Sequence, residues 1–170
     1  MDNVIAESER IILRLMDAGD EAQLKSVWCD PETMKYCGGA MQPERILEII
    51  KRDRRVYAKC GNAVFAVVRK ADRKLIGIAG CKLDEENPRR GELIYHFARE
   101  AWGKGYATET VQAYLDWVRM HGRMDFVHAS VMPENMASIS VLKKCGFNQN
   151  GFVQFADTGF VDEPYFELKI

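Results

Sequence analysis

The chain has 170 residues, of which 47% are hydrophobic and 29% charged, a composition that fits one globular domain and excludes a disordered or collagen-like chain. Lys and Arg number 24 against 25 Asp and Glu, giving a net charge of −1 without a long basic block, so we expect no nucleic-acid partner. No apolar run approaches the ~20 residues of a membrane span, and Asp2, Glu7 and Glu9 leave no apolar segment for a secretory signal. We therefore expect a single domain over residues 1–170 and no membrane partner.

The cysteines and histidines favour neither a disulfide framework nor a metal site. The five cysteines (Cys29, Cys37, Cys60, Cys81 and Cys145) are an odd number at irregular spacing, without a C-x-x-C pair. They are typical of small buried residues that are kept reduced in the cytoplasm. The three histidines lack the spacing of a zinc motif. We expect a cytoplasmic location and no metal.

In chain order, the first predicted elements are a strand and two helices. Residues 11–15 form the strand, and Asp17 is a suitable N-cap for the first helix, whose apolar residues recur at helical spacing. Pro43 suits the first position of the second helix. The charged run 51–55 is predicted to be the solvated face of that helix.

The middle of the chain is predicted to contain a hairpin and a further strand. Residues 63–69 and 75–82 are rich in strand formers, and the polar residues 70–74 between them form the turn. After a charged loop, residues 92–97 alternate as in a strand with two distinct faces.

The C-terminal part adds two helices and three strands. The helices are expected over 103–119 and 133–144, the second of them ended by Gly146. The strands are expected over 126–131, 147–155 and 160–170. This order predicts a mixed α/β sheet of about seven strands covered by helices.

Residues 102–109 (WGKGYATE) are the most informative stretch for function. They follow a predicted strand and open an amphipathic helix, so two glycines can turn the backbone and leave N–H groups pointing outward. With the positive end of the helix dipole, and with Lys104, these groups can hold an anion such as pyrophosphate. The stretch is neither a G-x-G-x-x-G fingerprint nor a P-loop. Taken alone, a G-x-G before a helix is more often a structural turn than a binding site.

Two further motifs accompany this turn. Residues 135–138 (NMAS) lie about 30 positions later and lead into 141–147 (VLKKCGF), and the chain opens with SERIILR at 8–14. In this order and spacing, the three motifs resemble the GNAT superfamily of acyl-CoA N-acyltransferases. The opening resembles its branch of ribosomal-protein N-terminal acetyltransferases. The resemblance implies a mostly antiparallel sheet with a splayed central pair of strands and about four flanking helices.

The resemblance also implies where acetyl-CoA, the co-substrate, would bind. Backbone amides of the glycine turn would hold its pyrophosphate, and main-chain groups of Tyr95 and Phe97 would pair with the pantetheine arm and polarise the thioester. The Asn135 amide would bond the same arm, although a helix N-cap explains this residue equally well. The cofactor-binding residues expected in this way are Tyr95, Phe97, Trp102, Gly103, Lys104, Gly105, Tyr106, Ala107, Thr108, Asn135, Ser138 and Lys143.

The catalytic groups are assigned from the same resemblance. Many family members carry a catalytic tyrosine where this chain has Leu142, which cannot protonate a thiolate. Ser138 is the expected substitute, with a tyrosine such as Tyr165 or water as alternatives. Glu92 is the expected base, because an amine must be deprotonated before it attacks; a solvated glutamate at a strand end is the competing interpretation.

Three other polar residues near these motifs have simpler explanations. Glu109 fits a first-turn acid that the helix dipole favours. His96 and His128 are expected to be structural.

The predicted function is transfer of an acetyl group from acetyl-CoA to a primary amine, either a protein N-terminus or a small molecule, by direct attack in a ternary complex. A non-catalytic acyl-CoA sensor and a generic α/β fold are the alternatives, and a homodimer is left open. The resemblance implies an acceptor cleft around residues 28–45 and 155–164. The acidic residues there are Asp30, Glu32, Asp157, Asp162 and Glu163.

Overall fold

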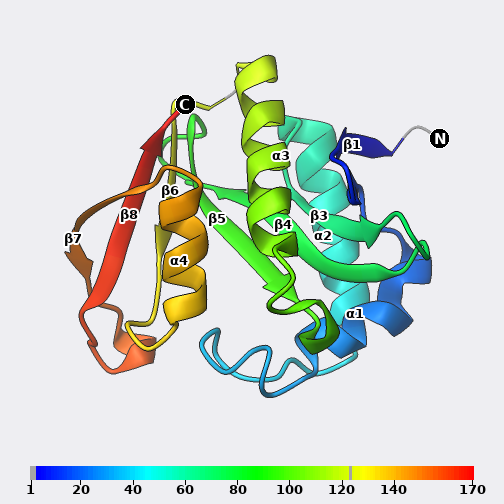
Figure 1. Cartoon of the computed structure of the whole chain (residues 1–170), viewed down its shortest axis with the longest axis horizontal. Helices are drawn as coiled ribbons and strands as arrows, with labels where there is room; N and C mark the ends of the chain where they lie inside the picture. The colour runs from blue at the N-terminus through cyan, green and yellow to red at the C-terminus, as the bar shows by residue number, and fades with distance from the viewer. Residues whose placement is uncertain (1–2, 123) are drawn as a thin grey trace.

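The computed structural model describes residues 3–122 and 124–170, and its centre is one eight-stranded sheet (Figure 1). The strands lie in the order β1-β2-β3-β4-β5-β6-β8-β7. Their bounds are β1 Val4–Glu7, β2 Ile11–Arg14, β3 Val64–Arg69, β4 Leu75–Leu83, β5 Arg90–Phe97, β6 Phe126–Ser130, β7 Asn148–Val153 and β8 Glu163–Lys169. The helices are α1 Glu21–Trp28, α2 Arg45–Cys60, α3 Tyr106–His121 and α4 Met136–Lys144, with 3-10 turns η1 Ala18–Asp20, η2 Arg99–Ala101 and η3 Ala156–Thr158. The mixed sheet with four helices confirms the expected fold class.

Two apolar cores lie on opposite faces of the sheet. Helices α3 and α4 cover one face, where Phe65, Tyr114 and Phe166 are fully buried. Helices α1 and α2 cover the other, over Ala66 and Ile78. Neighbouring residues of β3 therefore point into different cores, as the period of two in a strand requires. Both cores together fix the position of the central strands.

The splayed pair is formed by β5 and β6. These two strands are parallel, and they pair only at Arg90↔Phe126, Gly91↔Val127 and Glu92↔His128. Beyond Glu92, β5 pairs with β4 alone as far as Phe97, and β6 turns toward β8. Figure 1 shows the two ribbons diverging below this point. The backbone of β5 from Leu93 onward therefore has one edge without a partner strand.

Several element boundaries differ from those that the sequence predicts. An additional short strand, β1, pairs with β2 and raises the strand number to eight. Helix α2 begins at Arg45 rather than Pro43, and α4 begins at Met136 because Asn135 caps it. Strand β8 starts only at Glu163, since Phe160 has a positive φ of 59° that a strand does not accommodate.

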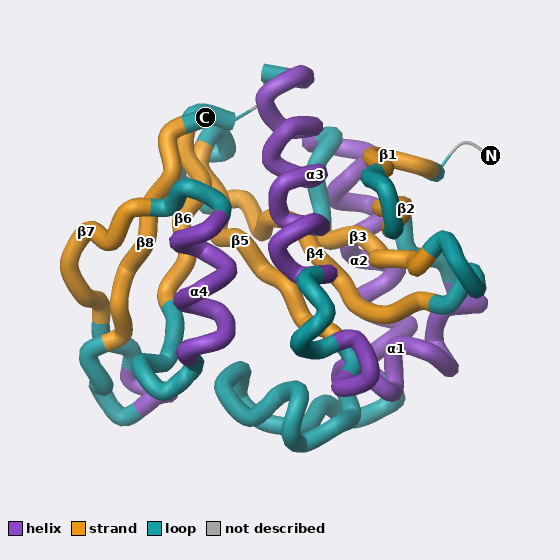
Figure 2. Tube along the Cα trace, viewed as in Figure 1, coloured by secondary structure: helices purple, strands orange, loops and turns teal. Residues whose placement is uncertain are grey.

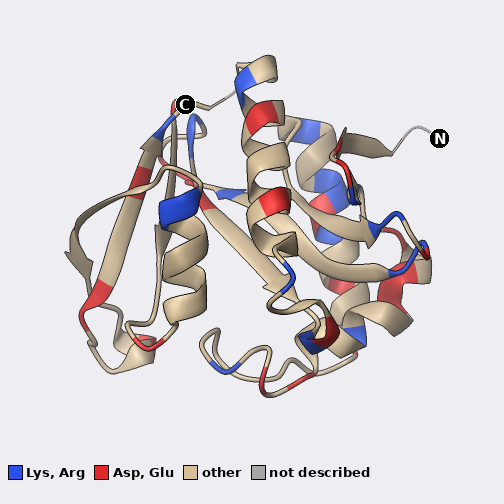
Figure 3. Cartoon of the chain, in the orientation of Figure 1, with Lys and Arg blue, Asp and Glu red and all other residues tan. Residues whose placement is uncertain are grey.

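The interpretation of residues 51–55 as a wholly solvated face was wrong at Asp53. This side chain is buried, and its Oδ1 accepts hydrogen bonds from Arg52. Burial raises the pKa of Asp53, and Arg52 opposes that shift. Figure 3 shows the basic residues of α2 as blue bands along the helix.

Within the described ranges, no helix has the length and apolar character to cross a membrane.

Candidate active site

A cavity of about 440 Å³ lies where β5 and β6 separate. One side is lined by β5 from Glu92 to His96 and another by β6 and the start of α4. Three loops close its lower end: residues 36–38, 131–135 and 155–158. Figure 2 shows these segments at the same end of the molecule, in teal except for the 3-10 turn η3, which is purple. Because the sheet is open at this point, the cavity reaches side chains that belong to both faces.

On the α4 side, Tyr95, Asn135 and Ser138 come together. The hydroxyl of Tyr95 donates to the backbone carbonyl of Ser138 at 3.2 Å, and Asn135 Oδ1 accepts from the Ser138 N–H at 3.2 Å. The second contact is the N-cap of α4. Burial raises the pKa of Tyr95 to about 12, so its hydroxyl keeps its proton and remains a donor at neutral pH.

On the opposite side, the cavity collects carboxylates. Glu92, Asp157 and Glu163 all line it. The thiol of Cys37 lies within the electrostatic reach of two of them. Cys37 is an exposed residue, unlike the buried cysteines that the sequence predicts, but desolvation of its thiol raises the pKa of Cys37, and the negative charges of Glu92 and Glu163 raise it further. Cys37 therefore stays a neutral thiol beside two acids.

Glu163 is the most unusual residue of this group. Its exposed fraction is 5%, and its Oε1 is buried without a hydrogen-bond partner in the described chain. A buried carboxylate oxygen without a donor is costly, and native proteins rarely leave one unexplained. A cationic or hydrogen-bond-donating group bound in the cavity would satisfy it.

His96 lines the same cavity but has different chemistry. Burial lowers the pKa of His96 to about 4, so the ring is neutral at physiological pH. Trp28 Nε1 donates to His96 Nδ1 at 3.3 Å. An indole nitrogen can only donate, so the ring proton of His96 sits on Nε2. His96 is thus a fixed hydrogen-bond donor on this side.

The glycine turn lies between β5 and α3, beyond the end of the open strand edge. Gly103 and Gly105 have φ values of +69° and +80°, which L side chains rarely adopt. In the described chain, the N–H groups of residues 103–105 donate to no other backbone group. They precede the first turn of a 16-residue helix, whose dipole favours an anion there.

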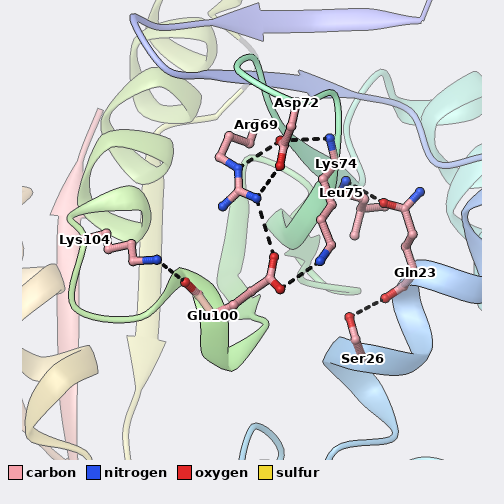
Figure 4. Close-up of polar contacts among 8 residues, drawn as sticks. All are labelled: Gln23, Ser26, Arg69, Asp72, Lys74, Leu75, Glu100 and Lys104. Carbon is pink, nitrogen blue, oxygen red and sulfur yellow. Dashed lines mark hydrogen bonds and ion pairs between the residues drawn. The ribbon is translucent and has the colours of Figure 1, made fainter.

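The glycine turn contacts the 3-10 turn η2, which in turn contacts the β3–β4 hairpin. Lys104 Nζ donates to the carbonyl of Glu100 at 2.7 Å, and the Glu100 carboxylate accepts from Lys74 at 2.8 Å. Arg69 lies 3.6 Å from the same carboxylate (Figure 4). Trp102 Nε1 donates to the carbonyl of Phe97 at 2.6 Å, which ties the turn to the end of β5.

Other predicted residues lie away from the cavity lining. Phe97 is buried in the core, and Lys143 is exposed on α4. Leu142, at the position of the usual family tyrosine, has an exposed fraction of 0%. His128 bonds to Asp84 at 2.9 Å, as a structural histidine would. The hydroxyl of Tyr165 contacts Arg90 and Glu167 and is not part of the lining.

The sequence reasoning missed part of this site. It named five acids for the acceptor cleft, and of these Asp157 and Glu163 line the cavity, whereas Glu32, Asp30 and Asp162 do not. Asp30 binds Arg99, and Asp162 accepts a hydrogen bond from Gln154. It did not identify Cys37 as part of the site. It also missed the hydroxyl of Tyr95, because the alternation of residues 92–97 places Tyr95 on the same strand face as the core residue Phe97.

Comparisons with known proteins agree with this geometry. A family model described as "Acetyltransferase (GNAT) domain" matches residues 10–148. An uncharacterized N-acetyltransferase, p20 of Bacillus licheniformis, is 29% identical over 152 residues, covering 86% of this chain and 84% of the relative. The chain therefore belongs to the GNAT acetyltransferase family and is an N-acetyltransferase.

Solved structures of acetyltransferases share the fold. A GNAT-family acetyltransferase from Bacillus anthracis superposes with a TM-score of 0.84 at 23% identity, covering 96% of this chain and 97% of that one. A ribosomal-protein-S5-alanine acetyltransferase from Vibrio fischeri gives 0.80 at 18%, covering 97% and 96%. The microcin C7 self-immunity acetyltransferase MccE, solved with acetyl-CoA and AMP, gives 0.80 at 15%, covering 96% and 94%.

Proposed function

We propose that this N-acetyltransferase moves an acetyl group from acetyl-CoA to a primary amine by direct attack in a ternary complex. The observation that carries the proposal is the single cavity at the splayed strands. Its lining includes the hydroxyl-bearing residues Tyr95 and Ser138 near α4. It also includes three carboxylates away from α4, within the same space of about 440 Å³. A thioester entering from α3 and an amine entering past Glu163 would meet there.

The donor is argued from the turn and the open strand edge. Pyrophosphate oxygens would accept from the amides of the glycine turn, and the pantetheine amides would pair with β5 beyond Glu92. The Asn135 side chain retains its amide nitrogen for the same arm, since only its oxygen caps α4. These residues fit a long, extended ligand with an anionic end.

The reaction removes two protons from the ammonium nitrogen of the acceptor and supplies one to the leaving sulfur. Free alkylamines have a pKa near ~10, so the acceptor arrives as an ammonium ion. Glu92 takes a proton from it, directly or through water, and the neutral nitrogen attacks the thioester carbon. The carbon–sulfur bond then breaks, and the leaving sulfur takes a proton from Ser138 or Tyr95. The attacking nitrogen gives up its second proton as it becomes an amide, and this proton restores the hydroxyl. The products are an N-acetyl amide and free coenzyme A.

The acceptor is argued from charge. Glu92, Asp157 and Glu163 make the cavity attractive to a cation. A protein N-terminus, a polyamine and an amino-group antibiotic all meet this condition. A structural neighbour that is named a ribosomal-protein-S5-alanine acetyltransferase supports a protein N-terminus as the acceptor. The odd number and irregular spacing of the cysteines are typical of a cytoplasmic protein, and we propose that location.

An acceptor screen tests the proposal. Release of free thiol from acetyl-CoA is followed with N-terminal peptides, polyamines and amino-group antibiotics, and the acetylated product is identified by mass. We expect acceptor-dependent thiol release with at least one class. Tight calorimetric binding of coenzyme A without turnover for any amine would instead favour the sensor alternative. No binding would remove both.

A further inference from the structure

The opening motif of the chain has no role in the chemistry above, yet its side chains reach the glycine turn. Ser8 and Arg10 lie in the connection between β1 and β2, and both bind Glu109 in the first turn of α3. Ser8 Oγ donates to Glu109 Oε1 at 2.6 Å, and the Arg10 N–H donates to the same oxygen at 2.8 Å. Arg10 Nε and Nη2 each lie 2.6 Å from Glu109 Oε2. We call Ser8, Arg10 and Glu109 the β1–β2 anchor.

The anchor uses both oxygens of the Glu109 carboxylate. Burial alone would raise the pKa of Glu109, but the hydrogen bonds from Ser8 and Arg10 outweigh it and leave this pKa below its ordinary value. The carboxylate is therefore charged and fully occupied at neutral pH. This arrangement gives Glu109 a defined partner in addition to the helix dipole.

Arg10 also contacts the glycine turn directly. Its Nη1 donates to the carbonyl of Lys104 at 3.0 Å, and its guanidinium lies 4.6 Å from the centre of the Tyr106 ring. A Cβ atom built on Gly105 would lie 3.4 Å from Arg10 Nη2. One side chain thus spans the acid of the helix and the backbone of the turn.

The contact with Lys104 has a geometric consequence. In a planar trans peptide, the carbonyl of one residue and the N–H of the next point in opposite directions. Holding the Lys104 carbonyl against Arg10 therefore directs the Gly105 N–H away from Arg10. Gly105 is the N-cap of α3, where an outward N–H can meet an anion.

We infer that Arg10, held by Glu109, is a positioning residue that orients the Gly105 amide for the pyrophosphate of coenzyme A. The inference rests on the proposed function. A plain surface ion pair is the alternative, since the Arg10 and Glu109 side chains are 43% and 17% exposed. Such pairs contribute little to stability. The two explanations differ in whether ligand binding depends on the pair.

The test compares two donors that differ in the anionic end. Acetyl-CoA carries the pyrophosphate, and S-acetyl-pantetheine lacks it. The variants are Arg10→Lys, which keeps the charge but loses the fork that serves Glu109 and Lys104 together, and Glu109→Gln. The matched control is Arg89→Lys, at an exposed two-point pair with Asp125 whose side chains are 53% and 50% exposed.

We expect both anchor variants to weaken calorimetric binding of coenzyme A about tenfold, the size of one charge-assisted hydrogen bond. The kcat/KM for acetyl-CoA falls by a similar factor, mostly through KM, and that for S-acetyl-pantetheine stays within twofold. Arg89→Lys changes neither. Unchanged binding, or an equal loss with both donors, overturns the inference. If the parent chain itself does not bind coenzyme A, the proposed function fails first.

Discussion

The contact between Trp28 and His96 decides which ring nitrogen of the histidine in the cavity carries the proton. Because the indole N–H donates to Nδ1, His96 presents a proton on Nε2 and has no free lone pair toward the acceptor. The Trp28 side chain is buried in the core between α1 and the sheet, so this orientation is held by packing. His96 is therefore unsuited to act as the base.

The lowered pKa of His96 predicts a pH dependence of stability. The ring has a pKa of about 4 in the folded chain against about 6.5 when unfolded, so between these values the unfolded state binds more protons. Stability is full above pH 6.5 and falls by roughly 3 kcal/mol as pH decreases to 4. Urea unfolding at pH 7, 5.5 and 4.5 measures it, and His96→Gln should flatten this part of the profile. An equal slope in parent and variant would contradict the assignment.

The sequence predicted those parts of the site that are determined by a few neighbouring residues. Two glycines before an amphipathic helix specify the turn at 103–105, and Asn135 before Met136 specifies a helix cap. Both features depend on a few adjacent residues, and both are present. The alternation of residues 92–97 likewise reflected a strand between two cores.

The remainder depends on contacts between distant segments. Glu163 is buried because β8 crosses to lie between β6 and β7, and no local pattern around Glu163 reports that crossing. Arg10 and Glu109 are 99 positions apart, so the SERIILR motif could be matched to a family but not to a partner. Asp53 was assigned to a solvated face because a charged run conceals one inward-facing position.

The positive φ of Gly105 predicts that a side chain there is harmful to donor binding. Gly105→Val would strain the backbone at φ +80° and displace the amide that faces the pyrophosphate. Gly122→Val is the control, since Gly122 has φ +59° at the other end of α3. We expect both to lose stability, and only Gly105→Val to weaken calorimetric binding of coenzyme A, by at least tenfold. Equal binding in the two variants would place the phosphate site elsewhere.

The two donors near α4 predict which group protonates the leaving sulfur. Ser138→Ala and Tyr95→Phe each remove one hydroxyl, and loss of a general acid typically lowers kcat about 10²–10⁴-fold. We expect one of these variants to show that loss with little change in KM for acetyl-CoA. The control is Ser140→Ala, an exposed serine on the same helix. If neither variant loses turnover, water protonates the sulfur.

The unpartnered oxygen of Glu163 predicts a role in acceptor binding. Glu163→Gln keeps the shape but removes the charge that would attract an ammonium ion, so KM for the amine should rise at least tenfold, with KM for acetyl-CoA unchanged. Because a buried unpaired charge is removed, Tm should not fall. Asp162→Asn is the control, since Asp162 is bonded to Gln154. A lower Tm with unchanged kinetics would show that Glu163 is structural.

Glu92 predicts the shape of the pH–rate profile. As the base for a protonated amine, it should give a rate that rises with pH through one ionisation and then levels. Glu92→Gln retains the size and hydrogen-bonding reach of the side chain, so the fold should persist while kcat at pH 7 falls about 10²-fold or more. At high pH the amine loses its proton in solution, and the variant should recover toward the parent. Glu86→Gln, in the exposed loop before β5, is the control. A defect that is constant across pH would mean that Glu92 positions the acceptor, and no defect would leave it a half-buried residue of β5 without a part in the reaction. If Glu92→Gln has no defect, the candidate base is Glu163, a buried carboxylate in the cavity lining. A loss of rate at pH 7 that recovers at high pH in Glu163→Gln would then identify Glu163 as the base.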